Sequence, residues 1–95
     1  MYARTVNARA QPGRLRELLT TIRASVEPSV GTRPGLRHVL FLVDRDAERI
    51  LTVTLWDTEA DAREVDTSDD AEEQFLRVQT LLSGSPIVTF YEVAE

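Results

Sequence analysis

The chain contains no cysteine, which excludes disulfide bonds, thiolate nucleophiles and thiolate metal sites. All eleven basic residues are arginine, so a Schiff-base lysine and the lysine of a phosphate loop are also excluded. No apolar run approaches the roughly 18–20 residues of a membrane span. The N-terminus enters a strand-like pattern at once, without the apolar segment of a secretory signal. These absences predict a cytoplasmic protein with no membrane partner.

The length and the charge of the chain limit the number of domains and the kinds of partner that it can have. Ninety-five residues fit one domain, which we place at residues 1–95. A formal charge of −5 argues against a nucleic-acid partner. Nine acids between Asp57 and Glu73 are opposed by Arg63 alone. Because no EF-hand spacing accompanies them, we interpret this stretch as a solvated helix face and expect no metal site.

The first half of the chain shows a strand followed by a helix. Tyr2 to Arg9 alternates small, polar and apolar residues and is typical of a strand. Pro12-Gly13 then breaks the pattern, and apolar residues recur at helical spacing from Arg14 until Pro28 ends the helix. The apolar residues of that stripe are Leu15, Leu18, Leu19, Ile22 and Val26.

The second half begins with a hairpin and closes with a helix and a strand. The apolar runs Val39–Val43 and Ile50–Trp56 flank a short charged turn. Thr58 is a candidate N-cap for a first helical segment, which residues 66–69 interrupt. A better helix follows with Ala71, Phe75, Val78 and Leu82 on one face, and Ile87–Val93 forms the last strand.

The element order is therefore β-α-β-β-α-β, which predicts an α+β ferredoxin-like fold. Right-handed crossovers give a four-stranded antiparallel sheet with both helices on one face. The strands at Val39–Val43 and Val88–Val93 carry apolar residues on both faces, so the other face of the sheet also needs cover. We predict that a second copy of the chain provides it, as a homodimeric α/β barrel joined through the sheet face.

The hairpin register decides where the only histidine lies. A three-residue loop at Asp46–Glu48 would pair Arg45 with Arg49 and place His38 opposite Trp56. Thr52 and Thr54 would then lie near an imidazole that titrates near neutral pH and could act as a base. A shift of one residue would dissolve this arrangement, and a histidine at a strand start is often a rim residue.

Strand parity separates a pocket face from a partner face. If Thr52, Thr54 and Trp56 face the helices, then Leu51, Val53 and Leu55 face the partner subunit. We assign Val39, Phe41 and Val43 to that partner face as well.

The chain resembles the antibiotic biosynthesis monooxygenase (ABM) family of dimeric α/β barrels. The resemblance covers nearly the whole length and is carried by the βαββαβ order, by Pro12-Gly13 before the first helix, and by the segment Leu51–Ala60. Its most specific part is Trp56 closing the third strand, followed by a short polar turn and Glu59-Ala60. The resemblance implies a ligand pocket between the sheet and the helices. It also implies, for some members, oxidation of polyketide-type phenols by O2 without metal or flavin.

The site residues implied by the resemblance match this chain in part. Trp56 corresponds to the tryptophan that lines the pocket in catalytic members, although such a residue is also a common core plug. Oxygenase members commonly carry an asparagine four residues earlier, where this chain has Thr52. Asn7 on the first strand could supply the missing amide, and Arg4 could stabilise an anion. Haem-degrading relatives use a histidine on the following helix; residues 63–66 contain none, so we expect no cofactor.

Three functions remain open at this point. The first is a cofactor-free monooxygenase acting on a small aromatic or polyketide-like substrate, with His38, Trp56 and Asn7 as catalytic candidates. Thr52, Thr54, Arg4 and Phe75 would contact the substrate. The second is a non-catalytic dimeric module that binds a small hydrophobic ligand. The third is a non-redox cyclase or isomerase in which His38 is the acid–base group.

Overall fold

The computed structural model describes residues 1–67 and 69–94. The strands are β1 (Tyr2–Arg9), β2 (Leu36–Asp44), β3 (Arg49–Trp56) and β4 (Ile87–Glu92), and the helices are α1 (Leu15–Val26), α2 (Glu59–Glu64) and α3 (Asp69–Val78). Short 3-10 turns extend the helices at Glu27–Ser29, Val65–Thr67 and Gln79–Leu81. The predicted βαββαβ order is confirmed, with the second helical region divided into α2 and α3.

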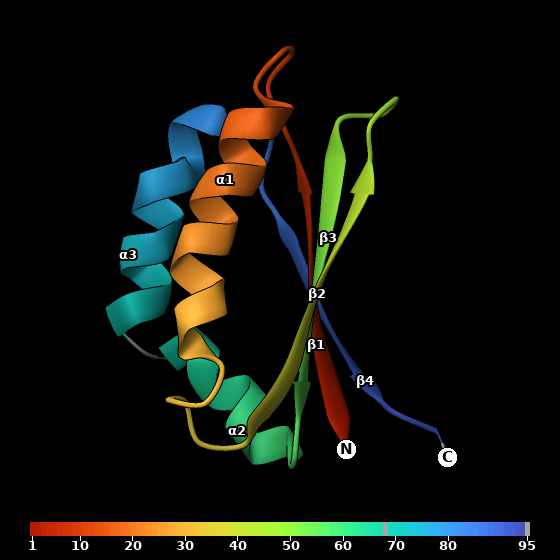
Figure 1. The fold of residues 1–95 in the computed structure, drawn as a ribbon, viewed down its shortest axis with the longest axis vertical. Helices are drawn as coiled ribbons and strands as arrows, with labels where there is room; N and C mark the ends of the chain where they lie inside the picture. Colours follow the sequence, from red (N-terminus) through yellow and green to blue (C-terminus); the bar gives the residue numbers. More distant parts are fainter. Residues whose placement is uncertain (68, 95) are drawn as a thin grey trace.

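The four strands form one antiparallel sheet in the order β2-β3-β1-β4. Figure 1 shows all three helices on the same side of this sheet, with α1 and α3 side by side and α2 near the end where β1 begins. This is the ferredoxin-like α+β arrangement predicted from the sequence. The opposite side of the sheet, called the outer face below, carries no other element of the described chain (Figure 1).

Local sequence signals explain where the helices begin and end. Pro28 lies in the 3-10 turn after Val26, where a proline cannot continue the α-helical hydrogen bonds. The hydroxyl of Thr58 accepts a hydrogen bond from the backbone N–H of Asp61 at 3.1 Å, which confirms the predicted N-cap. The break between α2 and α3 falls at residues 65–68, of which Ser68 lies outside the described residues.

The predicted register of the hairpin is wrong by one residue. Asp44, not Arg45, pairs with Arg49, so the loop has four residues, Arg45–Glu48. The Asp44 carboxylate accepts a hydrogen bond from the backbone N–H of Ala47 at 3.1 Å, and Glu48 has a φ of 53°. An aspartate that binds the backbone inside a turn favours this longer loop. A bulge between Leu36 and His38 then leaves Leu36, not His38, opposite Trp56.

The corrected register changes which residues of β2 face the helices. Val39 pairs with Thr54 and Phe41 with Thr52, so these residues and Val43 lie on the helix face, not on the predicted partner face. Leu40 and Leu42 lie instead on the outer face, opposite Val53 and Leu51. Both leucines are 51% exposed. The outer face is therefore apolar, as predicted, but through a different set of β2 side chains.

The buried core between the helices and the sheet has two parts. One cluster comprises Ala8, Ala10, Leu18, Ile50, Leu81 and Leu82, and the other comprises Leu36, Trp56 and Ala62. The first cluster takes in the predicted stripe of α1, with Leu15, Leu19 and Ile22 packed against its buried members. Leu18 and Ile50 are fully buried and anchor α1 to the sheet.

Replacing Leu18 with alanine is expected to lower the free energy of unfolding by about 2–5 kcal/mol, because it removes buried methyl groups and leaves a void. The matched control is Leu76→Ala on α3, where the leucine is 56% exposed. That variant should stay within about 0.5 kcal/mol of the wild type. Urea unfolding followed by circular dichroism measures both values, and equal effects would contradict the assigned core.

Candidate functional site

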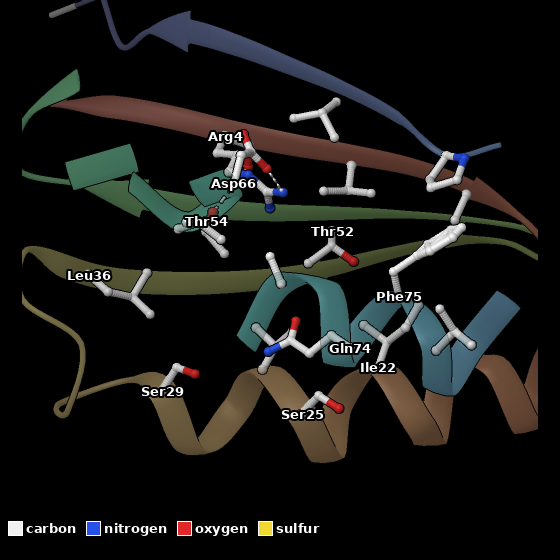
Figure 2. A pocket seen from close by; sticks show the side chains of 18 of the residues that line it. Arg4, Ile22, Ser25, Ser29, Leu36, Thr52, Thr54, Asp66, Gln74 and Phe75 are labelled. Carbon is white, nitrogen blue, oxygen red and sulfur yellow. Dashed lines mark hydrogen bonds and ion pairs between the residues drawn. The ribbon is translucent and has the colours of Figure 1, made fainter. Parts of the chain in front are cut away.

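A cavity of about 290 Å³ lies between the sheet and the helices (Figure 2). Its sheet wall comes mainly from β1 and β3, and its helix wall from α1 and α3. The sheet side includes Arg4, Val6, Ala8, Leu36, Thr52, Thr54, Trp56 and Val88; the helix side includes Ile22, Ser25, Val26, Ala71, Gln74, Phe75 and Val78. The lining is mainly apolar, with a few polar groups, as in small-molecule sites.

The cavity exists because short side chains occupy the middle of the helix face. Val6 on β1 lies beside Thr52 on β3, and neither side chain reaches far toward the helices. The larger residues Leu18, Ile50 and Trp56 belong to the two core clusters, not to this central stretch. The clusters hold the helices to the sheet at two places, and the space between those places stays open.

Trp56 is fixed at the cavity by a chain of hydrogen bonds. Its indole Nε1 donates to the Thr54 hydroxyl at 2.8 Å, and this hydroxyl donates to the backbone carbonyl of Arg4 at 3.2 Å. Trp56 is 3% exposed and also packs in the core cluster with Leu36 and Ala62. The residue therefore combines both roles that the sequence left open: it is a core residue whose ring also lines the cavity.

Two further polar side chains lie at the cavity without a hydrogen bond to the described residues. The Thr52 hydroxyl comes from the sheet wall and the Gln74 amide from α3, and Figure 2 shows both directed into the space between the walls. Thr52 is 7% exposed. Among the described residues, the Thr52 hydroxyl is not one of the enclosed polar atoms, so it can bind a polar group of a ligand in the cavity.

An ion pair forms part of the cavity wall. The Arg4 Nη2 donates to the Asp66 carboxylate at 2.7 Å, with side-chain exposures of 15% and 40% (Figure 2). The Nε of Arg4 is buried and has no hydrogen-bond partner among the described residues. The wall thus contains a positively charged group with one unpaired N–H, which is enclosed by protein atoms.

The structure brings five of the seven candidate residues together and separates the other two. Five predicted residues line the cavity, namely Arg4, Thr52, Thr54, Trp56 and Phe75. His38 pairs with Leu55 on the outer face and is exposed, so its predicted position beside Trp56 is wrong. Asn7 pairs with Leu51 and Ile87 on the same outer face. Neither His38 nor Asn7 lines the cavity, so the proposed imidazole base and compensating amide are not placed there.

Sequence analysis missed several cavity residues. Asp66 was interpreted only as part of a helix break within the acidic stretch, and Gln74, Ser25, Ser29 and Arg33 were not considered. The side chains of Asp69 and Asp70 from the same acidic stretch lie outside the described part. Within that part, no group of three or more His, Cys, Asp or Glu side chains could hold a metal ion.

The sequence profile of the family described as antibiotic biosynthesis monooxygenase matches residues 1–73. The chain belongs to this ABM family. No curated protein matches it. No helix among the described residues of this ABM protein is long and apolar enough to cross a membrane.

Solved structures similar to this ABM protein share its fold at low sequence identity. A candidate antibiotic biosynthesis monooxygenase from Nitrosomonas europaea aligns with a TM-score of 0.84 and 18% identity, covering 100% of both chains. NE2512, a protein of unknown function from the same organism, aligns with a TM-score of 0.82 and 21% identity over 99% of this chain and 89% of its own. Rv0793 from Mycobacterium tuberculosis aligns with a TM-score of 0.80 and 16% identity over 99% and 95%. These likenesses show the fold.

Thr54→Val should lower the free energy of unfolding by about 1–3 kcal/mol, because it leaves the buried indole N–H of Trp56 without an acceptor. The matched control is Thr52→Val on the same strand and face. Its hydroxyl bonds to no described residue, so this change should be close to neutral. Thermal unfolding followed by the fluorescence of Trp56 compares the two variants. A larger loss for Thr52→Val would contradict the hydrogen-bond chain.

Proposed function

We propose that the protein is a cofactor-independent monooxygenase that oxidises a small aromatic or polyketide-like substrate in the cavity. The main observation behind this proposal is the mainly apolar cavity, which has Trp56 on its wall and the positively charged Arg4 side chain, with one unpaired N–H, in its lining. Membership of the ABM family supports the reaction class.

The dimensions of the cavity favour a ligand of two or three rings. An apolar cavity of roughly 150 Å³ is large enough for benzene, whereas this cavity has about 290 Å³. Aliphatic and aromatic walls would hold the rings, and the few polar groups would orient them. A flat hydroxylated aromatic molecule fits both requirements.

The proposed reaction needs no electron donor other than the substrate. In the net conversion, a methylene group of the substrate and one molecule of O2 give a carbonyl group and one molecule of water. The substrate supplies all the electrons, and one oxygen atom leaves as water. An ionised substrate transfers electrons to O2 more readily than its neutral form does. A cation beside the substrate oxygen favours the ionised form, and Arg4 is positioned to supply that charge.

The structure argues against one of the two alternative functions and is compatible with the other. A cyclase or isomerase that depends on His38 loses its acid–base group, because His38 is exposed on the outer face. A non-catalytic ligand-binding module remains compatible with the same cavity. The O2 dependence of product formation separates the alternatives.

Oxygen uptake with a panel of hydroxylated two-ring and three-ring aromatics tests the proposal. We expect uptake with at least one compound, and a loss of about tenfold or more in Ala71→Phe, which fills the cavity from α3. The matched control, Ala24→Phe on the exposed side of α1, should retain turnover within about twofold.

Each other outcome has a distinct meaning. Product formed without O2 would contradict the monooxygenase and favour an isomerase or cyclase. Ligand binding without turnover would favour the non-catalytic module. Equal turnover in Ala71→Phe and wild type would show that the reaction does not occur in the cavity.

The outer face of the sheet is the proposed interface of a homodimer. Its side chains include His38, Leu40, Leu42, Leu51, Val53, Leu55, Ile87 and Tyr91. Leu40, Ile87 and Tyr91 are 51%, 65% and 55% exposed in the single chain. Monomeric proteins rarely expose so continuous an apolar patch. A second copy offers the same apolar surface and covers it by two-fold symmetry.

Leu40→Asp is expected to convert the dimer into a monomer, because each copy would bury an unpaired carboxylate in the interface. The matched control is Leu76→Asp, at a leucine that is 56% exposed on α3. Light scattering after size exclusion should give twice the 10.7 kDa chain mass for wild type and for the control. A stable Leu40→Asp dimer would contradict this interface.

A further inference from the structure

Two of the arginine–aspartate pairs among the described residues, Arg37–Asp57 and Arg4–Asp66, differ in how their guanidinium groups are hydrogen-bonded. Arg37 on β2 binds Asp57 through both Nε and Nη2, at 2.8 and 2.6 Å, and so fills one edge of its guanidinium group. Arg4 binds Asp66 through Nη2 alone, and the Nε–H of its guanidinium group is buried without an acceptor among the described residues. Arg37 is 58% exposed and Arg4 is 15% exposed, whereas both aspartates are 40% exposed. The incomplete pair is therefore the one at the cavity, where a small shift of the Arg4 side chain would bring its unpaired N–H to a ligand.

The position beside Arg4 Nε requires a particular chemical group. This group must accept a hydrogen bond from the arginine. It must not be a permanent anion, because the negative Asp66 carboxylate binds the same guanidinium group and would repel one. A hydroxyl group satisfies both neighbours, because it can accept from Arg4 and donate to Asp66.

We propose that Arg4 and Asp66 bind an acidic hydroxyl group of the ligand, with Asp66 as the proton acceptor. The ligand class is then a phenol or an enol on a small ring system. This inference rests on the proposed function, and it supplies the base that His38 does not provide.

The proton transfer can be written with all atoms accounted for. The O–H bond of the ligand breaks, its proton bonds to a carboxylate oxygen of Asp66, and the electron pair stays on the ligand oxygen. The Arg4 Nε–H then donates to this oxyanion. Asp66 becomes neutral at the same moment, so Arg4 keeps one negative partner before and after the transfer. The charge of the site does not change, which avoids an uncompensated charge in an apolar cavity.

The charged surroundings of the pair are simple. Among the described residues, the charged side chains that line the cavity are Arg4, Arg33 and Asp66. Asp66 is thus the carboxylate available at the cavity, and Arg4 is the cation that contacts it. The hydroxyl of Thr52, on the same face of the sheet, can donate a further hydrogen bond to the oxyanion.

A pair of probes tests this inference without knowledge of the natural substrate. The probes are 4-nitrophenol, whose phenolate has a distinct visible absorbance, and nitrobenzene, which lacks the hydroxyl group. Quenching of Trp56, the sole tryptophan and a cavity residue, reports binding of either probe. We expect the wild type to bind 4-nitrophenol about tenfold more tightly than nitrobenzene, as a hydrogen bond to a charged group allows.

The absorbance of bound 4-nitrophenol reports where its proton lies. At a pH where the free probe is mainly protonated, binding to the wild type should increase the phenolate fraction. In the wild type the proton stays within the site, so the bound phenolate fraction should change little over the pH range in which the free probe is mainly protonated. In Asp66→Asn the proton must leave to water, so the bound phenolate fraction should rise with pH over the same range. Arg4→Gln should remove the preference for 4-nitrophenol over nitrobenzene. Nitrobenzene should bind all three proteins within about twofold, which shows that the cavity is intact.

The exposed pair provides matched controls, because it has the same chemistry away from the cavity. Asp57→Asn and Arg37→Gln should leave both the affinity ratio and the phenolate fraction unchanged. Equal binding of the two probes by the wild type, or the same pH dependence of the phenolate fraction in the wild type and in Asp66→Asn, would overturn this inference and leave the aromatic-binding cavity standing. Failure of both probes to quench Trp56 would overturn the ligand-binding cavity itself.

Discussion

The alternation of side chains along the sheet is the constraint on which the rest of the structure depends. A strand places successive residues on opposite faces, so one pairing, Asp44 with Arg49, fixes the face of each β2 residue from Asp44 back to His38, where the bulge begins. That pairing sends Phe41 toward the helices and Leu40 to the outer face. The same alternation on β1 puts Arg4 at the cavity and Asn7 on the far side. The cavity and the apolar outer face therefore lie on opposite sides of one sheet.

Within the helix face, the cavity and the core share one set of contacts. Leu18 and Trp56 hold the helices to the sheet at separate places, and short residues such as Thr52 lie between them. The hydrogen bond from Trp56 to Thr54 fixes the indole while its ring borders the open space. Preorganised walls of this kind allow a few polar groups to orient a ligand at little entropic cost.

Much of the fold could be predicted from the sequence, because strong local signals mark its elements. The helical stripe around Leu18, the cap at Thr58 and the turn before Ile87 each depend on neighbouring residues. The hairpin register could not be predicted in the same way, because Asp44 binding the backbone of Ala47 decides between two loop lengths. The position of Asp66 was also beyond local reasoning. Asp66 lies in the 3-10 turn after α2, so which acid of the charged stretch contacts Arg4 depends on how α2 packs against β1.

The cavity has a thermodynamic consequence for a chain of this length. The apolar side chains that line the cavity face open space instead of packing against one another, so they forgo part of the stabilisation that burial gives, roughly 25 cal/mol per Å². Domains of this size retain only about 5–15 kcal/mol in total. A bound ligand stabilises the folded chain by mass action, and this stabilisation grows with the logarithm of the ligand concentration above Kd. The amount of folded protein in a cell would then rise with the supply of the molecule that fills it.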